Sequence, residues 1–269
     1  MKIGMLSKKT TGMTGLMKEF FENGGHIVTI YTLKNLCINE TLFENDFFIL
    51  KSKKIIYIYT GHYLEKNNIL VIPNPNMIYT HKNRIEAHYL LKKAGLKLPE
   101  YYYGMVQTLQ DRLKPSDFPL ILKPIMGSGS RGVKKITSFG DLKAKNDQPL
   151  YLEKYIKGTH YLVYFIDDEI CILEKPPLSN EHVDMKEILI NDNNEDIREV
   201  VMRWKTHYNL LFGHLDIVRE YNTNKIYIVD PGSFPEFSNW RCDKNPAPKI
   251  CNLILKRYED LKFNNHKII

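Results

Sequence analysis

The sequence predicts a mixed fold, with an α/β unit at the amino terminus followed by a longer α+β region. Residues 2–31 alternate an apolar strand, an amphipathic helix and a second apolar strand, which is typical of a parallel sheet. Later segments instead pair short apolar runs across turns, at residues 118–133, 161–173 and 215–229. Such pairs predict antiparallel hairpins. The 269 residues suffice for one large domain or for two to three small ones.

Composition and charge restrict the kind of protein. No apolar run approaches the roughly 18 residues of a membrane span, and the stretch before Lys8 and Lys9 is too short for a secretory signal. The four cysteines lack C-x-x-C spacing, which argues against a zinc site or a disulfide framework and favours a cytoplasmic setting. The formal net charge of +7 indicates an anionic partner, or only a lysine-rich composition. Without a basic arm or recognition helix, no nucleic-acid partner is expected. A monomer is expected.

The amino-terminal unit begins with a strand at Lys2–Leu6 and a helix whose apolar residues recur every three to four positions. A glycine pair ends the helix, and a strand follows at His26–Tyr31. Ser7, Lys8 and Lys9 follow the first strand, at the sheet edge where ligands bind, although a solvated surface pair is the alternative. Further strands are expected at Phe47–Leu50, Ile55–Tyr59 and Ile69–Ile72, before a turn at residues 73–75.

A helix is expected from Asn83 to Ala94, with Gly95 closing it. Arg84 lies in the first turn of this helix, where the helix dipole does not favour a cation. A local inconsistency of this kind often marks a functional residue.

The central feature of the chain is the segment 118–133, in which a short apolar strand ends at Lys123 and breaks into a glycine-rich loop. Glycines at this density let backbone N–H groups turn inward around an anion, and the side chains add hydroxyl donors and fixed positive charge. The spacing matches neither the nucleotide P-loop nor the dinucleotide fingerprint. It predicts a phosphate cradle, with an ordinary flexible hairpin loop as the alternative. The loop residues are Gly127, Ser128, Gly129, Ser130, Arg131 and Gly132.

Two later segments carry further candidates. A strand over 150–152 runs into Glu153, Lys154, Tyr155 and Ile156, a strand end that suits backbone recognition of a flat heteroaromatic ring. A helix marked by Ile197, Val200, Val201 and Trp204 presents Arg203 and Lys205.

The hairpin at residues 215–229 places Asp216 on one strand and Asp230 at the end of the next. Two carboxylates on adjoining strands can share a hard cation such as Mg²⁺, although aspartates at strand ends commonly serve turns. The chain offers no Ser/His/Asp or Cys/His arrangement typical of nucleophilic catalysis, and its histidines show no metal-ligand spacing. A closing helix with apolar residues at 250, 253, 254 and 261 is expected to be scaffolding.

The order of these motifs resembles the ATP-grasp superfamily across nearly the whole chain. The segments 3–19, 71–79, 83–102, 151–166 and 172–177 resemble diphosphoinositol pentakisphosphate kinases, and the last two also resemble inositol tris/tetrakisphosphate kinases. In these kinases the second metal motif is Asp-x-Asn, whereas ligases carry Glu-x-Asn. Here it reads Asp230-Pro231-Gly232, so the asparagine ligand is missing, and Ser233, water or a backbone carbonyl would have to replace it. Leu162 departs as well, since relatives often have Lys or Arg there.

The resemblance implies an ATP-grasp fold, with a Rossmann-like domain at 1–82, a central subdomain at 83–155 and a carboxyl-terminal subdomain at 156–269. ATP would lie between two antiparallel sheets. Arg84 and Lys123 would hold the α- and β-phosphates, and Asp216 and Asp230 would bind Mg²⁺. The loop 127–131 would cover the phosphates, with Arg131 on the γ-phosphoryl group, and residues 153–156 would hold adenine. The expected cations for the substrate are Lys8, Lys9, His62, Lys175, Arg203 and Lys205.

The function expected from this resemblance is an ATP- and Mg²⁺-dependent inositol polyphosphate kinase. Its product would be an ester, or a pyrophosphate where the acceptor is an existing phosphate, which needs no general base. The alternatives are a carboxylate–amine ligase that works through an acyl phosphate, and a protein that only binds nucleotide or nucleic acid. Incubation with inositol phosphates or with amino acids separates the three.

Overall fold

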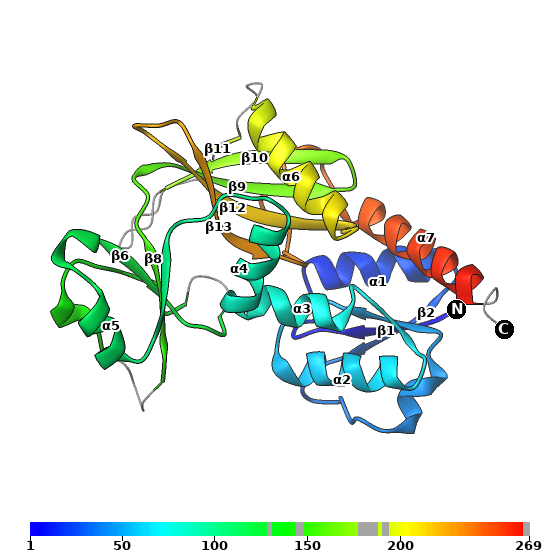
Figure 1. Ribbon diagram of the computed structural model, residues 1–269. Helices are drawn as coiled ribbons and strands as arrows, with labels where there is room; N and C mark the ends of the chain where they lie inside the picture. Colours follow the sequence, from blue (N-terminus) through cyan, green and yellow to red (C-terminus); the bar gives the residue numbers. More distant parts are fainter. Residues whose placement is uncertain (128–130, 144–147, 177–187, 190–193, 266–269) are drawn as a thin grey trace.

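The protein is built from three β-sheets, flanked by helices, that meet around a common centre (Figure 1). The computed structural model describes residues 1–127, 131–143, 148–176, 188–189 and 194–265. The first and last described residues lie on the same side of the molecule, beyond the parallel sheet (Figure 1). None of the described helices is both long enough and apolar enough to cross a membrane.

The amino-terminal unit contains a parallel sheet with the strand order β2-β1-β3-β4. Its strands are β1 (Lys2–Leu6), β2 (Ile27–Tyr31), β3 (Phe47–Leu50) and β4 (Leu70–Ile72). All four residues of β3 are buried, as expected for a central strand that is covered on both faces. Helix α1 (Met13–Asn23) buries Met13, Met17 and Phe21 on one face of the sheet and packs beside α7 (Ala247–Asn265). A short 3₁₀ helix, η1 (Glu40–Glu44), precedes β3.

The strand predicted at Ile55–Tyr59 is instead the beginning of helix α2 (Ile55–Lys66). A run of five apolar residues fits a strand or a buried helix, and periodicity alone does not separate the two. In the structure Tyr57, Ile58, Gly61 and Leu64 are buried, which is helical spacing. At Gly61 an added Cβ would lie 2.7 Å from the Pro75 side chain, so glycine permits the close approach of the next helix.

The turn predicted at residues 73–75 begins a helix that the prediction omitted, α3 (Pro75–Lys82). The Asn74 side chain accepts hydrogen bonds from the N–H groups of Asn76 and Met77, and Pro75 occupies the first turn. Asn followed by Pro is a helix-start signal as well as a turn signal. Asn83 caps the next helix, α4 (Arg84–Lys93), which confirms the helix predicted there.

The central unit is an antiparallel sheet with the strand order β5-β8-β6-β7. Its strands are β5 (Tyr101–Gly104), β6 (Leu120–Lys123), β7 (Lys134–Ile136) and β8 (Leu150–Lys154). Helix α5 (Val106–Arg112) and two 3₁₀ turns, η2 (Pro115–Asp117) and η3 (Phe139–Asp141), join these strands. Leu109, Leu120 and Leu152 belong to its small separate core.

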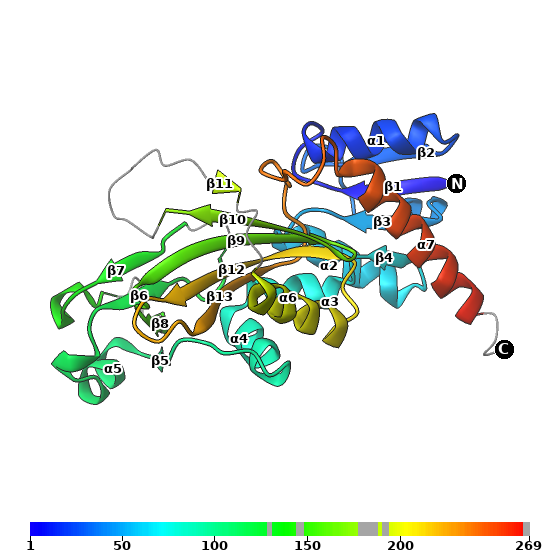
Figure 2. The ribbon, with the colours of Figure 1, turned by 90° about the horizontal axis from the view of Figure 1, so that it is seen from above.

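The third sheet is antiparallel, with the order β11-β10-β9-β12-β13. Figure 2 shows β9, β10, β12 and β13 running side by side from the parallel unit towards the central sheet. Its strands are β9 (Gly158–Ile166), β10 (Glu169–Lys175), β11 (Ile188–Leu189), β12 (Phe212–Glu220) and β13 (Ile226–Gly232). Helix α6 (Glu195–His207) buries Ile197, Val201 and Trp204 against the sheet face that carries Leu215 and Ile217. The predicted hairpins are therefore confirmed, while the domain boundaries at 82/83 and 155/156 stay predictions.

Candidate nucleotide and metal site

A buried lysine joins the two antiparallel sheets. Lys123 ends β6 and is only 7% exposed. Its ammonium pairs with the Glu153 carboxylate of β8 and donates to the backbone oxygen of Val229 in β13, at 2.7 Å. Glu153 also accepts a hydrogen bond from the Tyr151 hydroxyl at 2.9 Å, and that hydroxyl lies 3.0 Å from His88 Nδ1. Because the charges are paired and the remaining polar atoms are hydrogen-bonded, this buried ion pair can persist.

Arg84 provides a second connection between the sheets. Its Nη1 lies 2.6 Å from Asp230 Oδ1 on β13, and its Nε donates to the backbone oxygen of Pro124 at 2.9 Å. The charge of Arg84, which the helix dipole does not favour in the first turn of α4, is therefore compensated by the Asp230 carboxylate of β13. Arg84, Tyr151, Glu153 and Asp230 line one small cavity between the sheets.

The two predicted metal aspartates are directly opposite one another. Asp216 of β12 and Asp230 of β13 are paired residues in the antiparallel register. Asp216 forms an ion pair of 2.8 Å with Lys175 of β10. Burial acts to raise the pKa of Asp216, but Lys175 and then His214 outweigh it and hold the pKa below its ordinary value. Asp216 therefore stays ionised at neutral pH, the state in which a carboxylate can bind a cation.

The residues present fit Mg²⁺. Carboxylates on neighbouring strands are hard oxygen donors, and Mg²⁺ usually keeps several water or phosphate ligands beside one or two carboxylates. Among the residues that the structure describes, no group of three or more His, Cys, Asp or Glu side chains is arranged to hold a metal. The site would therefore depend on nucleotide phosphates to complete the coordination.

The missing asparagine at position 232 has a steric explanation. Gly232 is the register partner of His214 on β12, and a Cβ at this glycine would lie only 1.8 Å from His214 Cε1. The imidazole thus occupies the space that a side chain at 232 would need. Burial lowers the pKa of His214 to about 4, so the ring is neutral at pH 7 and does not repel a cation.

Replacing Gly232 by asparagine should therefore destabilise the fold rather than supply a metal ligand. We expect a loss of about 1–3 kcal/mol in the free energy of unfolding, measured by urea denaturation, because the new side chain overpacks against His214. The double substitution Gly232→Asn with His214→Ala opens the space and should recover most of that loss. Equal destabilisation of both variants would contradict the steric explanation.

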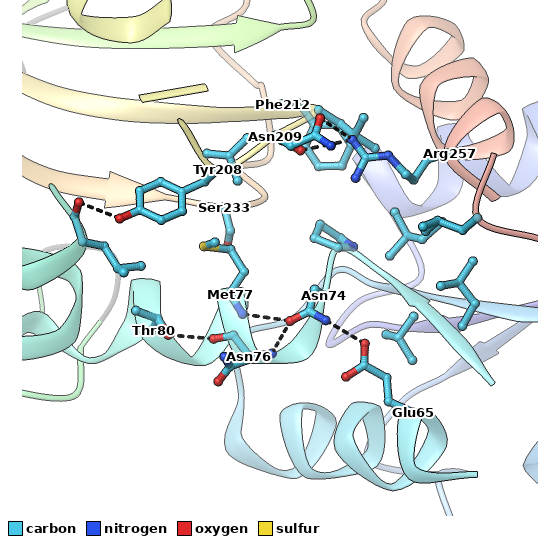
Figure 3. A pocket seen from close by; sticks show the side chains of 18 residues that line it. Glu65, Asn74, Asn76, Met77, Thr80, Tyr208, Asn209, Phe212, Ser233 and Arg257 are labelled. Atoms are coloured by element: carbon cyan, nitrogen blue, oxygen red, sulfur yellow. Dashed lines mark hydrogen bonds between the residues drawn. The ribbon is translucent and has the colours of Figure 1, made fainter. Parts of the chain in front are cut away.

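Ser233, one of the three predicted replacements for the missing ligand, lines a different cavity. The serine helps to line a space of about 400 Å³ between β4, α3 and the start of β12 (Figure 3). Neither Asp216 nor Asp230 lines this cavity. The Ser233 hydroxyl is buried and has no hydrogen-bond partner among the described residues. Ser233 is therefore placed away from the aspartates.

The glycine-rich loop is described only in part. Gly127 donates its N–H to the backbone oxygen of Lys82 at 3.3 Å, and an added Cβ there would lie 3.4 Å from Arg84. Gly132 has a φ of +77°, a conformation that glycine adopts readily. Arg131 is exposed on the loop. Ser128, Gly129 and Ser130 lie outside the described residues, so the predicted phosphate cradle stays a prediction.

The predicted adenine segment follows β8 as expected, but two of its backbone donors already have partners. The N–H of Lys154 donates to Glu100 at 2.7 Å, and that of Tyr155 donates to Pro119 at 3.1 Å. An adenine contact is thus left to Ile156, which is nearly buried, and to other backbone groups of the segment.

The predicted substrate cations are only partly brought together. Lys175 lies in the site, paired with Asp216, while Lys8 and Lys9 are exposed after β1.

The other predicted cations lie on helices α6 and α2. Arg203 pairs with Glu199, and Lys205 pairs with Asp167 and Asp168. Arg203 and Lys205 both lie on α6, which packs on the sheet face that carries Leu215 and Ile217. Because side chains alternate along a strand, Asp216 faces the other side of the sheet. His62 lies on α2, and no described hydrogen bond or ion pair joins it to the cluster. The roles of these three residues in substrate binding stay predictions.

Two lysines that the sequence analysis did not single out lie beside the site. Lys51 is buried, and its ammonium pairs with Glu236 at 2.9 Å. Lys53 is partly buried, and both metal aspartates affect its pKa. Both residues follow β3 at the carboxyl edge of the parallel sheet, and this position is the signal that could have revealed them.

Comparison with known proteins identifies the fold. Residues 81–184 match the family model of the ATP-grasp domain. The N5-carboxyaminoimidazole ribonucleotide synthase of Aquifex aeolicus (strain VF5) is 29% identical over 100 residues, which cover 35% of this chain and 27% of that protein. The chain spans less than a third of the length of the curated relatives that it matches.

Solved structures resemble the chain over nearly its whole length. The D-alanine–D-alanine ligase from Bacillus anthracis complexed with ATP has a TM-score of 0.69 and 15% identity, over 98% of this chain and 99% of that chain. The ATP-grasp ligase PsnB complexed with minimal precursor, Mg and ADP has a TM-score of 0.67 and 14% identity, over 96% and 98%. The chain therefore has the ATP-grasp fold that the sequence predicted. The similar structures hold ATP, or ADP with Mg, which are the cofactors that the sequence predicts for this chain.

These comparisons overturn the predicted inositol phosphate kinase. The relative described above is a ribonucleotide synthase and the two similar structures are ligases, and none of the three is an inositol phosphate kinase. The structure supplies a physical reason for the error. Three of the cations assigned to a polyanionic substrate, Lys175, Arg203 and Lys205, are neutralised by acidic residues of the protein itself.

Proposed function

We propose that the protein is an ATP- and Mg²⁺-dependent carboxylate–amine ligase that acts on small molecules or peptides through an acyl phosphate. The observation that carries this proposal is the arrangement of Lys123, Arg84, Asp216 and Asp230, which brings two cations and two carboxylates together between the antiparallel sheets. The ligase names of the similar proteins support the choice of reaction class.

The reaction proceeds in two steps. A carboxylate oxygen of the first substrate attacks the γ-phosphorus of ATP, and the bond from the γ-phosphorus to the β,γ-bridging oxygen breaks, releasing ADP. The nitrogen of an amine then attacks the acyl carbon, phosphate leaves, and the amine loses a proton to water. The net products are ADP, inorganic phosphate and an amide.

The chain's own residues would position the nucleotide for this chemistry. Lys123 and Arg84 are held between the sheets by Glu153 and Asp230, and they would turn towards the α- and β-phosphates. Arg131 would make bidentate contact with the γ-phosphoryl group. Asp216 and Asp230 would hold Mg²⁺, which would offset the negative charge that develops during phosphoryl transfer.

A substrate panel tests the reaction class. The protein is incubated with ATP, Mg²⁺ and either D-alanine or peptides that offer terminal and side-chain carboxylates, and inositol hexakisphosphate serves as the negative control. We expect at least one carboxylate to raise the release of ADP and inorganic phosphate in equal amounts, with an amide product by mass spectrometry. ADP release with the phosphoryl group retained on an acceptor, or no turnover with any carboxylate, contradicts the proposal.

A further inference from the structure

One lysine in the loop after β3 has no described partner. Lys53 follows β3 by three residues, at the carboxyl edge of the sheet, and is partly buried. Within the described part of the chain, no hydrogen bond or ion pair reaches its ammonium group. A partly buried cation without a counter-ion is costly, which makes this amine a candidate for binding an anion from outside.

The backbone around Lys53 is fixed in place by its neighbour Lys51. The Lys51 N–H donates to the backbone oxygen of Leu6 at the end of β1, at 3.1 Å. The Lys51 ammonium donates to the backbone oxygen of Pro235 at 3.2 Å and to Glu236 Oε1 at 2.9 Å. The segment 51–53 is therefore held between the parallel sheet and the stretch of chain that follows β13.

The charged groups that act on the pKa of Lys53 are those of the site. Burial lowers the pKa of Lys53, Asp230 and Asp216 act to raise it, and Lys51 and Arg84 lower it further. The same amine in turn helps to lower the pKa values of two buried histidines, His81 of α3 and His214 of β12. Groups from β12, β13, α3 and α4 thus all interact with this one amine.

The other cations of this cluster already have partners. Arg84 is paired with Asp230, Lys175 with Asp216, and Lys123 with Glu153. Lys9 is exposed and lies near enough to Lys51 to lower its pKa. The N–H groups of the Lys53 ammonium, by contrast, donate to no described group.

We propose that Lys53 binds the carboxylate of the first substrate and holds it beside the aspartate pair. This inference rests on the proposed ligase function. An ammonium group can make one or two charge-assisted hydrogen bonds to a carboxylate, and it offsets the repulsion between that carboxylate and the triphosphate. Lys53 forms no covalent bond and transfers no proton; it orients the attacking oxygen.

Steady-state kinetics of Lys53→Met test the inference. For the carboxylate that stimulates the wild-type protein most in the panel of D-alanine and peptides, we expect the KM to rise by roughly 10- to 100-fold, because a charge-assisted contact is lost. The dissociation constant of the nucleotide, measured by calorimetry with Mg²⁺ and AMP-PNP, should change by less than about twofold. Lys53→Arg should recover part of the KM. The control is Lys54→Met, an exposed lysine one residue away, for which no change is expected.

Stability separates a binding role from a structural one. Since Lys53 has no described partner, Lys53→Met should leave the Tm unchanged or raise it. If the wild-type protein binds Mg²⁺ and AMP-PNP but no carboxylate stimulates it, the proposed function fails, and the role of Lys53 fails with it. If carboxylates do stimulate turnover but the KM of Lys53→Met equals the wild-type value, or its Tm falls, only the role of Lys53 is overturned.

Discussion

Asp230→Asn is expected to lower ATP-dependent turnover by roughly 10²- to 10³-fold, because it neutralises the proposed metal donor, which is also the counter-ion of Arg84. The residue lies at the end of an edge strand and is about 30% exposed, so the protein should still fold. The measurement is the rate of ADP release as a function of Mg²⁺ concentration, and we expect the requirement for Mg²⁺ to rise in the variant.

The matched control is Asp111→Asn, at an exposed aspartate on α5 whose carboxylate accepts a hydrogen bond from Gln107. Its turnover should equal that of the wild-type protein. Full activity of Asp230→Asn at wild-type Mg²⁺ concentrations would remove Asp230 from the metal site.

Lys123→Met is expected to have a large effect on stability as well as on nucleotide binding. The substitution leaves the Glu153 carboxylate buried without its cation, which costs about 3–5 kcal/mol in the free energy of unfolding. The link from β6 to the backbone of Val229 is also lost. Urea denaturation measures the loss of stability, and calorimetry with Mg²⁺ and AMP-PNP measures the loss of nucleotide binding.

The double variant Lys123→Met with Glu153→Gln separates these two effects. It removes the unpaired charge while the Tyr151 hydroxyl keeps an acceptor, so most of the stability should return. Nucleotide affinity should stay at least about tenfold weaker than in the wild-type protein, because the amine proposed to bind phosphate is still absent. Recovery of both properties would show that Lys123 only supports the fold.

The sequence was sufficient for the features that depend on local pattern. Strand–turn–strand patterns predicted the hairpin that carries Asp216 and Asp230, and the structure pairs these residues directly. The sequence was insufficient to predict an element where one local pattern fits two kinds of secondary structure. The apolar run at Ile55–Tyr59 fits a strand as well as the helix that it forms, and Asn74–Pro75 signals a turn as well as a helix start.

The chemistry of the site depends on contacts between distant segments, which no local pattern reveals. The Asp216 partner of Lys175 comes from another strand, and the charged groups that act on the pKa of Lys53 come from β12, β13 and α4. The substrate class was predicted wrongly because weight was placed on Asp230 within a single short motif and on cations that the protein neutralises itself. Gly232 could be recognised as a departure from the sequence, but its cause, the ring of His214, required the structure.

The transfer of ¹⁸O from the substrate carboxylate to phosphate tests the central claim most directly. A stimulating carboxylate from the panel is labelled with ¹⁸O and incubated with the protein, ATP, Mg²⁺ and an amine, and the released inorganic phosphate is analysed by ³¹P NMR. Attack of the carboxylate on the γ-phosphorus places one labelled oxygen in each released phosphate. Phosphate free of ¹⁸O, or a phosphoryl group that stays on the acceptor, would contradict the account.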